Sequence, residues 1–418
     1  MQQPDSQKDE IAPMLSDERV GASELGRLAT QAMNISARWR KRMLEPTKGT
    51  RRMRRYSMNE VSHISKVPKS TVKYRIDNGQ YPSGRVNPTN GYRSLSLEEI
   101  HQIMDIEGVR PTTGPELPAH SICCANFKGG SAKSTLSVYL AVHLAIHGYR
   151  VLLADLDPQG TATHVFGWQP DLHVRFEDTV MACFEQGKDL ADLSKSTHIH
   201  GLDVVRATPG MSQAEVVLMQ QSRSEDTDYW ESLSTCMAKA QEEYDVIVFD
   251  TPPSMSALAL NGIYAADGLL IPLPASMIDY ESCAVFFRIM SEIVQLFSDT
   301  NENDIERMFD YMRIVITRYS ETPANNQMAR WIQGTYSPHV LNTYFRNGDA
   351  ILNAAQQTKV LYELRSGKAK EDPEEGDQYD GDARTFRKTQ RRVDQVMSEI
   401  EGTISTNLQE KRTAIESA

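Results

Sequence analysis

The chain has 418 residues, with 45 Lys and Arg side chains against 56 Asp and Glu side chains and a formal net charge of -11. No stretch approaches the roughly 18 consecutive apolar residues that a transmembrane helix needs, and residues 1–9 are too polar to begin a secretory signal. Five cysteines without Cys-x-x-Cys spacing argue against zinc or iron–sulfur ligation by cysteine. We therefore expect a cytoplasmic protein of two or three domains with no membrane partner.

The charge is divided unevenly along the chain. Residues 1–110 carry 19 basic and 13 acidic side chains, for a net charge of +6, whereas residues 111–418 carry 26 and 43, for a net charge of -17. Asymmetry of this kind favours nucleic-acid contact by the basic part.

The first predicted elements are a disordered tail over residues 1–17 and a helix within residues 18–50. Apolar residues recur at steps of three and four over residues 18–44, which predicts one apolar stripe along a long helix. The stripe consists of Leu25, Leu28, Ala32, Ile35, Trp39 and Met43. We predict that this helix mediates dimerisation; packing against its own chain is the alternative.

Residues 51–110 show the order helix, turn, helix, hairpin, helix. Ser57 and Glu60 form a capping box before the first short helix, and the second runs from Pro68 to the C-cap signal Asn78-Gly79. A turn-rich hairpin over residues 81–93 precedes a further helix capped by Ser96 and Glu99. This order predicts a winged helix-turn-helix domain, and it resembles the DNA-binding head of MerR-type regulators.

In that geometry the second helix enters the major groove, with Val72 and Ile76 on its core face. We predict sequence-specific DNA binding by the polar face of this helix and by the arginines of the hairpin. These residues are Lys69, Ser70, Thr71, Lys73, Tyr74, Arg75, Arg85 and Arg93. A winged helix used for protein contacts is the alternative.

A Pro- and Gly-rich linker is predicted over residues 111–119, followed by one large domain over residues 120–418. Short apolar runs alternate with helical patterns along this domain. Continuously apolar runs of this length are typical of strands buried on both faces. The predicted strands are 121–126, 150–155, 202–207, 246–250, 268–273 and 312–317. We predict an α/β fold, a doubly wound and mainly parallel sheet.

A Gly-rich segment follows the first of these strands and precedes a helix that ends near residue 147. It reads Lys128, Gly129, Gly130, Ser131, Ala132, Lys133, Ser134 and Thr135. Glycines let backbone N–H groups surround a phosphate, a lysine reaches the outer phosphates and a hydroxyl binds Mg²⁺. Phe127 and Ala132 occupy the glycine positions of the plain P-loop pattern, so the sequence predicts a variant P-loop that binds nucleotide.

Aspartates end two more predicted strands. Asp155 and Asp157 follow the strand 150–155, and Asp250 ends the strand 246–250 before Thr251-Pro252-Pro253. In α/β sheets the carboxyl ends of the strands form the ligand-binding edge. Each aspartate alone would be read as a helix or turn cap, but together with the P-loop they predict a nucleotide and Mg²⁺ site.

These motifs resemble those of the deviant Walker ATPases of the ParA/MinD group. Over residues 18–410 the chain is similar to the long (type Ia) ParA-type partition ATPases, which carry an N-terminal DNA-binding domain. Ala132 departs from the resemblance, because most of the superfamily has glycine there. We expect its methyl group to affect turnover more than binding.

The resemblance implies ATP or ADP and Mg²⁺ as cofactors and a dimer that encloses two ATP molecules. Lys128 would reach the phosphates bound by the other subunit. Lys133 would hold the β- and γ-phosphates, Ser134 would ligate Mg²⁺ and Thr135 would bind the α-phosphate. Asp157 would orient the attacking water, Asp155 would support the metal and lysine, and Asp250 would hold Mg²⁺ through its water shell. The predicted catalytic residues are Lys128, Lys133 and Asp157.

The resemblance also implies a second DNA surface, without sequence preference, formed by basic residues late in the chain. The candidates are Arg346, Arg384, Arg387, Lys388 and Arg391. A solvated helix face, balanced by the acidic stretch 371–382, is the alternative.

The resemblance implies a DNA-partition ATPase in the cytoplasm, associated with the nucleoid. It would dimerise with ATP, bind bulk DNA, leave it after hydrolysis stimulated by a ParB-type partner, and regulate its own synthesis through operator binding by its winged domain. Whether such dimers grow into filaments on DNA is left open by the sequence. A nucleotide-sensing transcriptional regulator with little turnover is the alternative. A membrane-positioning relative is disfavoured because residues 403–418 are too polar for a membrane helix.

Overall fold

The computed structural model describes residues 21–44, 51–88, 91–113, 117–221, 228–299, 308–346, 348–366 and 376–417. It divides into two compact units, Met1–Arg51 and Arg52–Ala418. The predicted tail over residues 1–17 lies outside the described residues. The predicted boundaries at residues 110 and 119 are not tested by this division and stay predictions.

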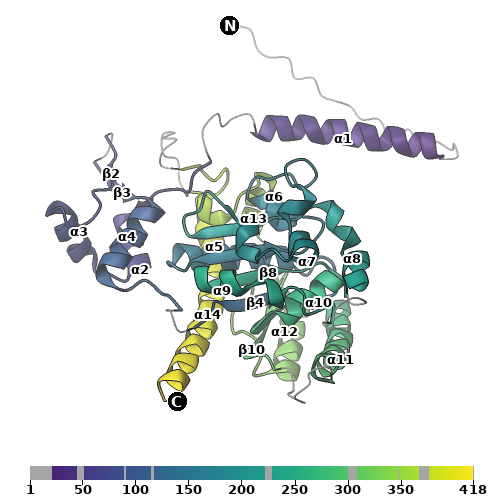
Figure 1. Cartoon of the computed structure of the whole chain (residues 1–418). Coiled ribbons are helices and arrows are strands. Elements are labelled where there is room, and N and C mark those ends of the chain that lie inside the picture. The colour runs from purple at the N-terminus through teal and green to yellow at the C-terminus, as the bar shows by residue number, and fades with distance from the viewer. Residues whose placement is uncertain are drawn as a thin grey trace, which may run out of the picture. The chain divides into compact units, whose positions relative to one another are not determined.

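The first unit contains the helix α1 (Ala22–Leu44), which corresponds to the predicted N-terminal helix (Figure 1). Leu25, Leu28 and Ile35, three members of its predicted apolar stripe, are exposed. The side chains of Trp39 and Met43 lie outside the described part of the structure. Dimerisation through this helix stays a prediction.

The second unit begins with three helices and a small antiparallel sheet. The helices are α2 (Met58–Ser65), α3 (Lys69–Asp77) and α4 (Leu97–Glu107), and the strands are β1 (Tyr56–Ser57), β2 (Arg85–Val86) and β3 (Arg93–Leu95), in the order β1-β3-β2. Capping boxes at Ser57 and Ser96 begin α2 and α4, as predicted. Val72 and Ile76 of α3 are buried, also as predicted.

The described residues of the large domain form a seven-stranded sheet in the order β10-β9-β4-β8-β5-β7-β6. Its strands are β4 (His120–Cys124), β5 (Val151–Asp155), β6 (Lys195–Ser196), β7 (Leu202–Val205), β8 (Val246–Asp250), β9 (Gly268–Pro274) and β10 (Tyr311–Thr317). All neighbouring strands pair in parallel except β6, a two-residue antiparallel edge strand. The mainly parallel sheet is confirmed, and β6 was not predicted.

Helices cover both faces of this sheet (Figure 1). They are α5 (Lys133–Ile146), α6 (Thr161–Val165), α7 (Met181–Gln186), α8 (Ala214–Gln221), α9 (Ala238–Glu243), α10 (Ala257–Tyr264), α11 (Met277–Asp299), α12 (Pro323–Tyr336), α13 (Asp349–Gln356) and α14 (Ala383–Glu416). Short 3-10 turns span Phe176–Asp178, Leu190–Leu193, Pro209–Gln213, Ser234–Cys236 and Leu361–Glu363. None of the described helices is both long enough and apolar enough to cross a membrane.

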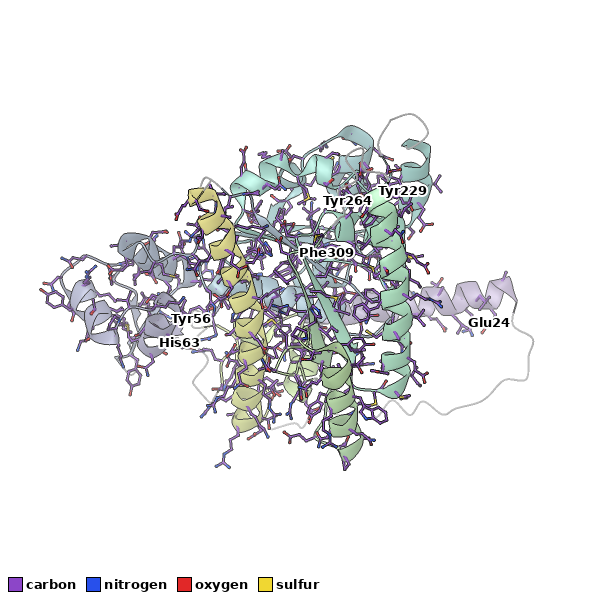
Figure 2. All side chains as sticks on the ribbon, turned by 90° about the horizontal axis from the view of Figure 1, so that it is seen from below. Glu24, Tyr56, His63, Tyr229, Tyr264 and Phe309 are labelled. Atoms are coloured by element: carbon purple, nitrogen blue, oxygen red, sulfur yellow. The ribbon has the colours of Figure 1, made fainter. Side chains whose placement is uncertain are left out.

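Alternate strand residues contribute to two hydrophobic cores. One core joins Leu153 and Val248 to α5, α13 and α14 and continues into the segment of α2, α3 and α4 through residues such as Met104. The other core joins Leu152 and Ile247 to α10 and α11, with Tyr229, Tyr264 and Phe309 packed against it. Figure 2 shows Tyr229 and Tyr264 on the α11 side, and Tyr56 and His63 on the other side, near α14.

Candidate nucleotide-binding site

The predicted phosphate-binding loop connects β4 to α5 and is fixed by hydrogen bonds to neighbouring strands. Asn126 donates from Nδ2 to the carbonyl oxygen of Pro272 at 2.8 Å and accepts at Oδ1 from the backbone N–H of Lys128 at 2.9 Å. Thr317, at the end of β10, donates from Oγ1 to the carbonyl oxygen of Ser131 at 2.9 Å. The loop is therefore anchored to β9 and β10, on one side of β4, and of its N–H groups only that of Lys128 takes part in these contacts.

Lys133 is buried at the start of α5, where its ammonium group donates to the carbonyl oxygen of Lys128 at 3.2 Å. Burial lowers the pKa of this lysine, while the nearby carboxylates of Asp250 and Asp157 oppose the change. A cation held inside the loop, close to two carboxylates, is suited to bind phosphate oxygens.

Ala132 adopts a left-handed backbone conformation, with φ 78° and ψ 27°, immediately before α5. Alanine is strained in this region because its Cβ approaches the following carbonyl oxygen, whereas glycine is not. The resemblance places glycine at this position, and the left-handed backbone gives a physical reason for that glycine.

Two carboxylates meet at the carboxyl edge of the sheet, as predicted. Asp155 and Asp250 are register partners on β5 and β8, and both are fully buried. Burial raises the pKa of Asp155 to about 7, although it accepts hydrogen bonds from the N–H and Oγ1 of Thr163 at 2.8 and 2.7 Å. Burial and the charge of Asp155 raise the pKa of Asp250 well above its usual range.

The fit of the site to Mg²⁺ can be judged from these oxygen atoms. Within the described part of the chain, Oδ2 of Asp250 is buried without a hydrogen-bond partner, and Ser134 belongs to the first turn of α5 beside it. Mg²⁺ takes oxygen ligands from carboxylates and hydroxyls. Ser134 and Asp250 therefore fit the ion. Both oxygens of Asp155 already accept hydrogen bonds, so it fits better as a supporting residue.

Asp157 lies just beyond β5 and lines a cavity of about 290 Å³. Pro253 also lines this cavity, and a Cβ placed on Gly129 of the loop would lie 3.9 Å from the Pro253 Cβ. The Asp157 carboxylate accepts a hydrogen bond from the N–H of Gln159 at 2.9 Å, and burial raises its pKa. Asp157 thus lines a cavity, and its electrostatic interaction with Lys133 places it near the loop.

The side chain of Lys128 pairs with a residue that the sequence did not predict as part of the site. Its Nζ lies 2.5 Å from Oδ1 of Asp279, in the first turn of α11. This partner could not be predicted from the sequence, because the two residues are far apart in the chain and Asp279 belongs to no motif.

Arg318 was also missed by the sequence analysis. It follows β10 with a left-handed φ of 51°, and a Cβ placed on Gly130 would lie 3.5 Å from its Nη1. A guanidinium group beside the phosphate-binding loop adds positive charge to the site. The one sequence feature that could have indicated Arg318 is its position directly after the predicted strand 312–317.

The residues predicted to contact DNA specifically are only partly free on the surface. Tyr74 is exposed, whereas Arg75 pairs with Glu107 of α4 and stacks on Tyr81. Arg93 pairs with Asp77 at 3.6 Å. The exposed polar face of α3 therefore consists mainly of Lys69, Ser70, Lys73 and Tyr74.

Two of the late basic candidates, Arg346 and Lys388, interact with the acidic side chain of Glu321. Oε1 of Glu321 lies 2.6 Å from Nη1 of Arg346 and 3.2 Å from Nη2 of Arg392. These arginines and Lys388 lower the pKa of Glu321. Arg346 also lies over the ring of Tyr319. The candidates on α14 are exposed: Arg384, Arg387, Lys388 and Arg391.

Comparisons with known proteins agree with this site. Protein SopA of Escherichia coli (strain K12) is 30% identical over 324 residues, which cover 74% of this chain and 81% of that protein. Chromosome partitioning protein ParA of Myxococcus xanthus (strain DK1622) is 38% identical over 152 residues, or 36% and 51% of the two chains. A solved structure described as "Partition Protein" has a TM-score of 0.62 at 17% identity and covers 92% of this chain and 99% of its own, which shows a shared fold. The family described as "AAA domain" matches residues 119–305.

A mainly parallel α/β sheet whose first strand leads through a phosphate-binding loop into a helix defines a P-loop NTPase. Within that class, the chain belongs to the ParA/Soj/SopA-type family of partition ATPases. The family predicted from the sequence is confirmed, and the predicted cofactors, ATP or ADP and Mg²⁺, agree with it.

Proposed function

We propose that this chain is a DNA-partition ATPase that hydrolyses ATP with Mg²⁺, dimerises with ATP and binds DNA in that state. The observation that carries the proposal is the convergence of Lys133, Asp157 and Asp250 around the phosphate-binding loop. Mg²⁺, when bound, would neutralise charge on the phosphate oxygens. Relatives named as partition proteins support the biological role.

In this proposal each residue of the chain has a separate task. The loop N–H groups and Lys133 hold the phosphates, and Ser134 and Asp250 hold the metal. Asp157 positions the water that attacks the outer phosphorus. Positioning and charge stabilisation supply most of the rate enhancement in phosphoryl transfer, so no covalent intermediate is required.

Dimerisation would bring Lys128 to the phosphates bound by the partner, where it would act as a charge supplied in trans. This requires Lys128 to leave Asp279, its partner in the single chain. The pair would therefore oppose dimerisation until ATP offers Lys128 a more negative partner.

DNA binding would use two surfaces. The winged helix-turn-helix region would bind an operator through the exposed polar face of α3, with autoregulation as the result. The cluster around Glu321 and the exposed basic residues of α14 would bind phosphates without sequence preference. Two copies of this weak surface in the ATP-bound dimer would bind bulk DNA more tightly than one. Binding to bulk DNA would associate the dimer with the nucleoid. Hydrolysis stimulated by a ParB-type partner would release the chain from the DNA.

The test is ATP hydrolysis by the full chain, with and without DNA and partner, compared with Asp157→Ala. Loss of a water-positioning group should lower kcat by about 10²-fold or more while ATP binding persists. Asp380→Ala, which removes an exposed aspartate, should leave kcat unchanged. If the wild type turned over no ATP under any of these conditions, the nucleotide-sensing regulator would be the better account.

A further inference from the structure

A second cluster of potential ligands lies at the far end of α5 from the phosphate-binding loop. Nε2 of His143 lies 3.0 Å, and Nδ1 of His147 lies 2.7 Å, from the same oxygen, Oε2 of Glu401 on α14. The three ligand atoms all lie within 4.8 Å of one another. Two imidazoles one helical turn apart thus face one carboxylate from another helix.

The donor set is that of a first-row transition-metal site. Zn²⁺ binds histidine nitrogens and carboxylate oxygens at about 2.0–2.2 Å, and ligands around such an ion lie roughly 3.3 Å apart. The present separations of 2.7 and 3.0 Å would need to widen by less than an ångström. Burial lowers the pKa of His143, which favours the neutral form of the ring.

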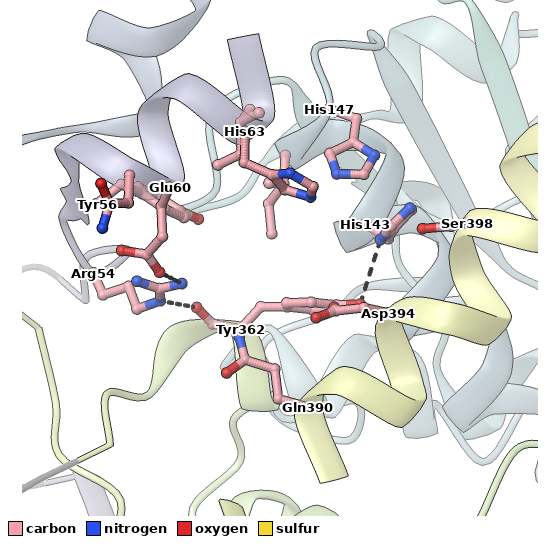
Figure 3. Close-up of a pocket in the computed structure, with 13 residues that line it drawn as sticks. Arg54, Tyr56, Glu60, His63, His143, His147, Tyr362, Gln390, Asp394 and Ser398 are labelled. Carbon is pink, nitrogen blue, oxygen red and sulfur yellow. Dashed lines mark hydrogen bonds and ion pairs between the residues drawn. The ribbon is translucent and has the colours of Figure 1, made fainter. Parts of the chain in front are cut away.

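The surroundings of His143 supply the support that metal-bound histidines usually have. Its other ring nitrogen, Nδ1, lies 3.4 Å from the hydroxyl of Tyr362 (Figure 3). Tyr362 in turn interacts with the carboxylate of Asp394. Such outer contacts fix the tautomer and orientation of a ligating imidazole.

The cluster also has access to solvent. His143 and His147 line a cavity of about 290 Å³ that is bordered by α14 and, across from it, by Arg54, Glu60 and His63 of the winged region (Figure 3). The cavity gives an entry path and space for a water molecule as a fourth ligand, since three protein ligands plus water is a common zinc arrangement.

We propose that His143, His147 and Glu401 bind a divalent transition-metal ion, best fitted by Zn²⁺, that links the C-terminal end of α5 to α14. This proposal does not depend on the ATPase reaction. The contrasting reading is that Glu401 only accepts hydrogen bonds from two histidines.

A second group of possible metal ligands differs from this one, because a lysine is paired with its carboxylates. His120, Asp267 and Asp310 also lie within ligand distance of one another. There, however, Nζ of Lys411 lies 3.4 Å from Asp267 and 2.7 Å from Asp310. The ammonium group already occupies the position of a cation. No described lysine or arginine is paired with Glu401 in this way.

The experiment titrates the full, metal-free chain with Co²⁺ at neutral pH in excess Mg²⁺, which occupies oxygen-rich sites. Visible absorption of tetrahedral or five-coordinate Co²⁺ should saturate at one equivalent and be abolished by Zn²⁺. His147→Ala and Glu401→Gln should each weaken Co²⁺ binding at least tenfold. His339→Ala, which removes an exposed histidine, should bind as the wild type does.

Thermal unfolding gives a second readout that does not depend on the spectrum. Zn²⁺ should raise the Tm of the wild type and of His339→Ala, but not that of His147→Ala. His147 is partly exposed, so its loss should not prevent folding even if Glu401→Gln does. Absence of a Co²⁺ spectrum in the wild type, or an equal spectrum in His147→Ala, would overturn the proposal.

Discussion

The contact between Lys128 and Asp279 makes a quantitative prediction about dimerisation. Asp279→Asn removes the negative charge that holds Lys128 in its own subunit and leaves a side chain of the same size. The backbone N–H of Asp279 also donates to Oγ of Ser276 at 3.2 Å, and the Ser276 hydroxyl donates to the Asp279 carboxylate, a hydrogen bond that the amide oxygen of asparagine can still accept. The substitution should therefore free Lys128 without unfolding the start of α11.

The size of the effect follows from the exposure of the pair. The side chains of Lys128 and Asp279 are 34% and 15% exposed, so the pair is partly solvated and contributes about 0.2–1 kcal/mol. Two such pairs break when a dimer forms. The dimerisation constant with ATP should therefore rise by about 2- to 30-fold, at tenfold for each 1.4 kcal/mol.

The assay is sedimentation of the full chain over a concentration series with a non-hydrolysable ATP analogue. Glu281→Gln provides the matched control, because it removes one exposed negative charge from the same helix. An Asp279→Asn dimer no tighter than that of the control would refute the idea that this pair competes with dimerisation.

Three further predictions concern the carboxylates, the loop and the late basic surface. Burial raises the pKa of Asp155 to about 7, so the folded state keeps a proton that the unfolded state releases above about pH 4. The free energy of unfolding of the nucleotide-free protein should therefore fall from pH 4 to pH 7 more steeply in the wild type than in Asp155→Asn; parallel urea-denaturation profiles would contradict this. Ala132→Gly removes left-handed strain of about 1 kcal/mol but adds unfolded-state freedom of about 0.5–1 kcal/mol, so Tm should change little while kcat rises; an unchanged or lower kcat would count against the loop argument. Arg346→Ala should weaken random-DNA binding and reduce the log-log salt slope by about 0.9 in filter-binding titrations, and an unchanged slope would exclude a phosphate contact.

The site could be predicted from the sequence where its residues belong to local patterns. The loop 128–135 and the aspartates at strand ends are local, and parallel strands bring their carboxyl ends to one edge. The structure accordingly places Asp155 and Asp250 as register partners. The short helices α2 and α4 were predicted from capping boxes for the same reason.

Long-range ion pairs could not be predicted in this way. Asp279 for Lys128, Glu107 for Arg75 and Glu321 for Arg346 are single acidic residues without a motif. Each of these acidic residues forms an ion pair, inside the same chain, with a basic side chain that was predicted to bind phosphate or DNA. The strand β6 was missed because two exposed residues carry no alternating apolar pattern.

The central claim is that ATP switches this chain between a free state and a DNA-bound state. The direct measurement is a titration of the full chain against random DNA with ATP, with ADP and without nucleotide. Tight binding only with ATP, lost in Lys133→Ala, is the predicted result. Equal binding to random DNA in all three conditions would contradict the account.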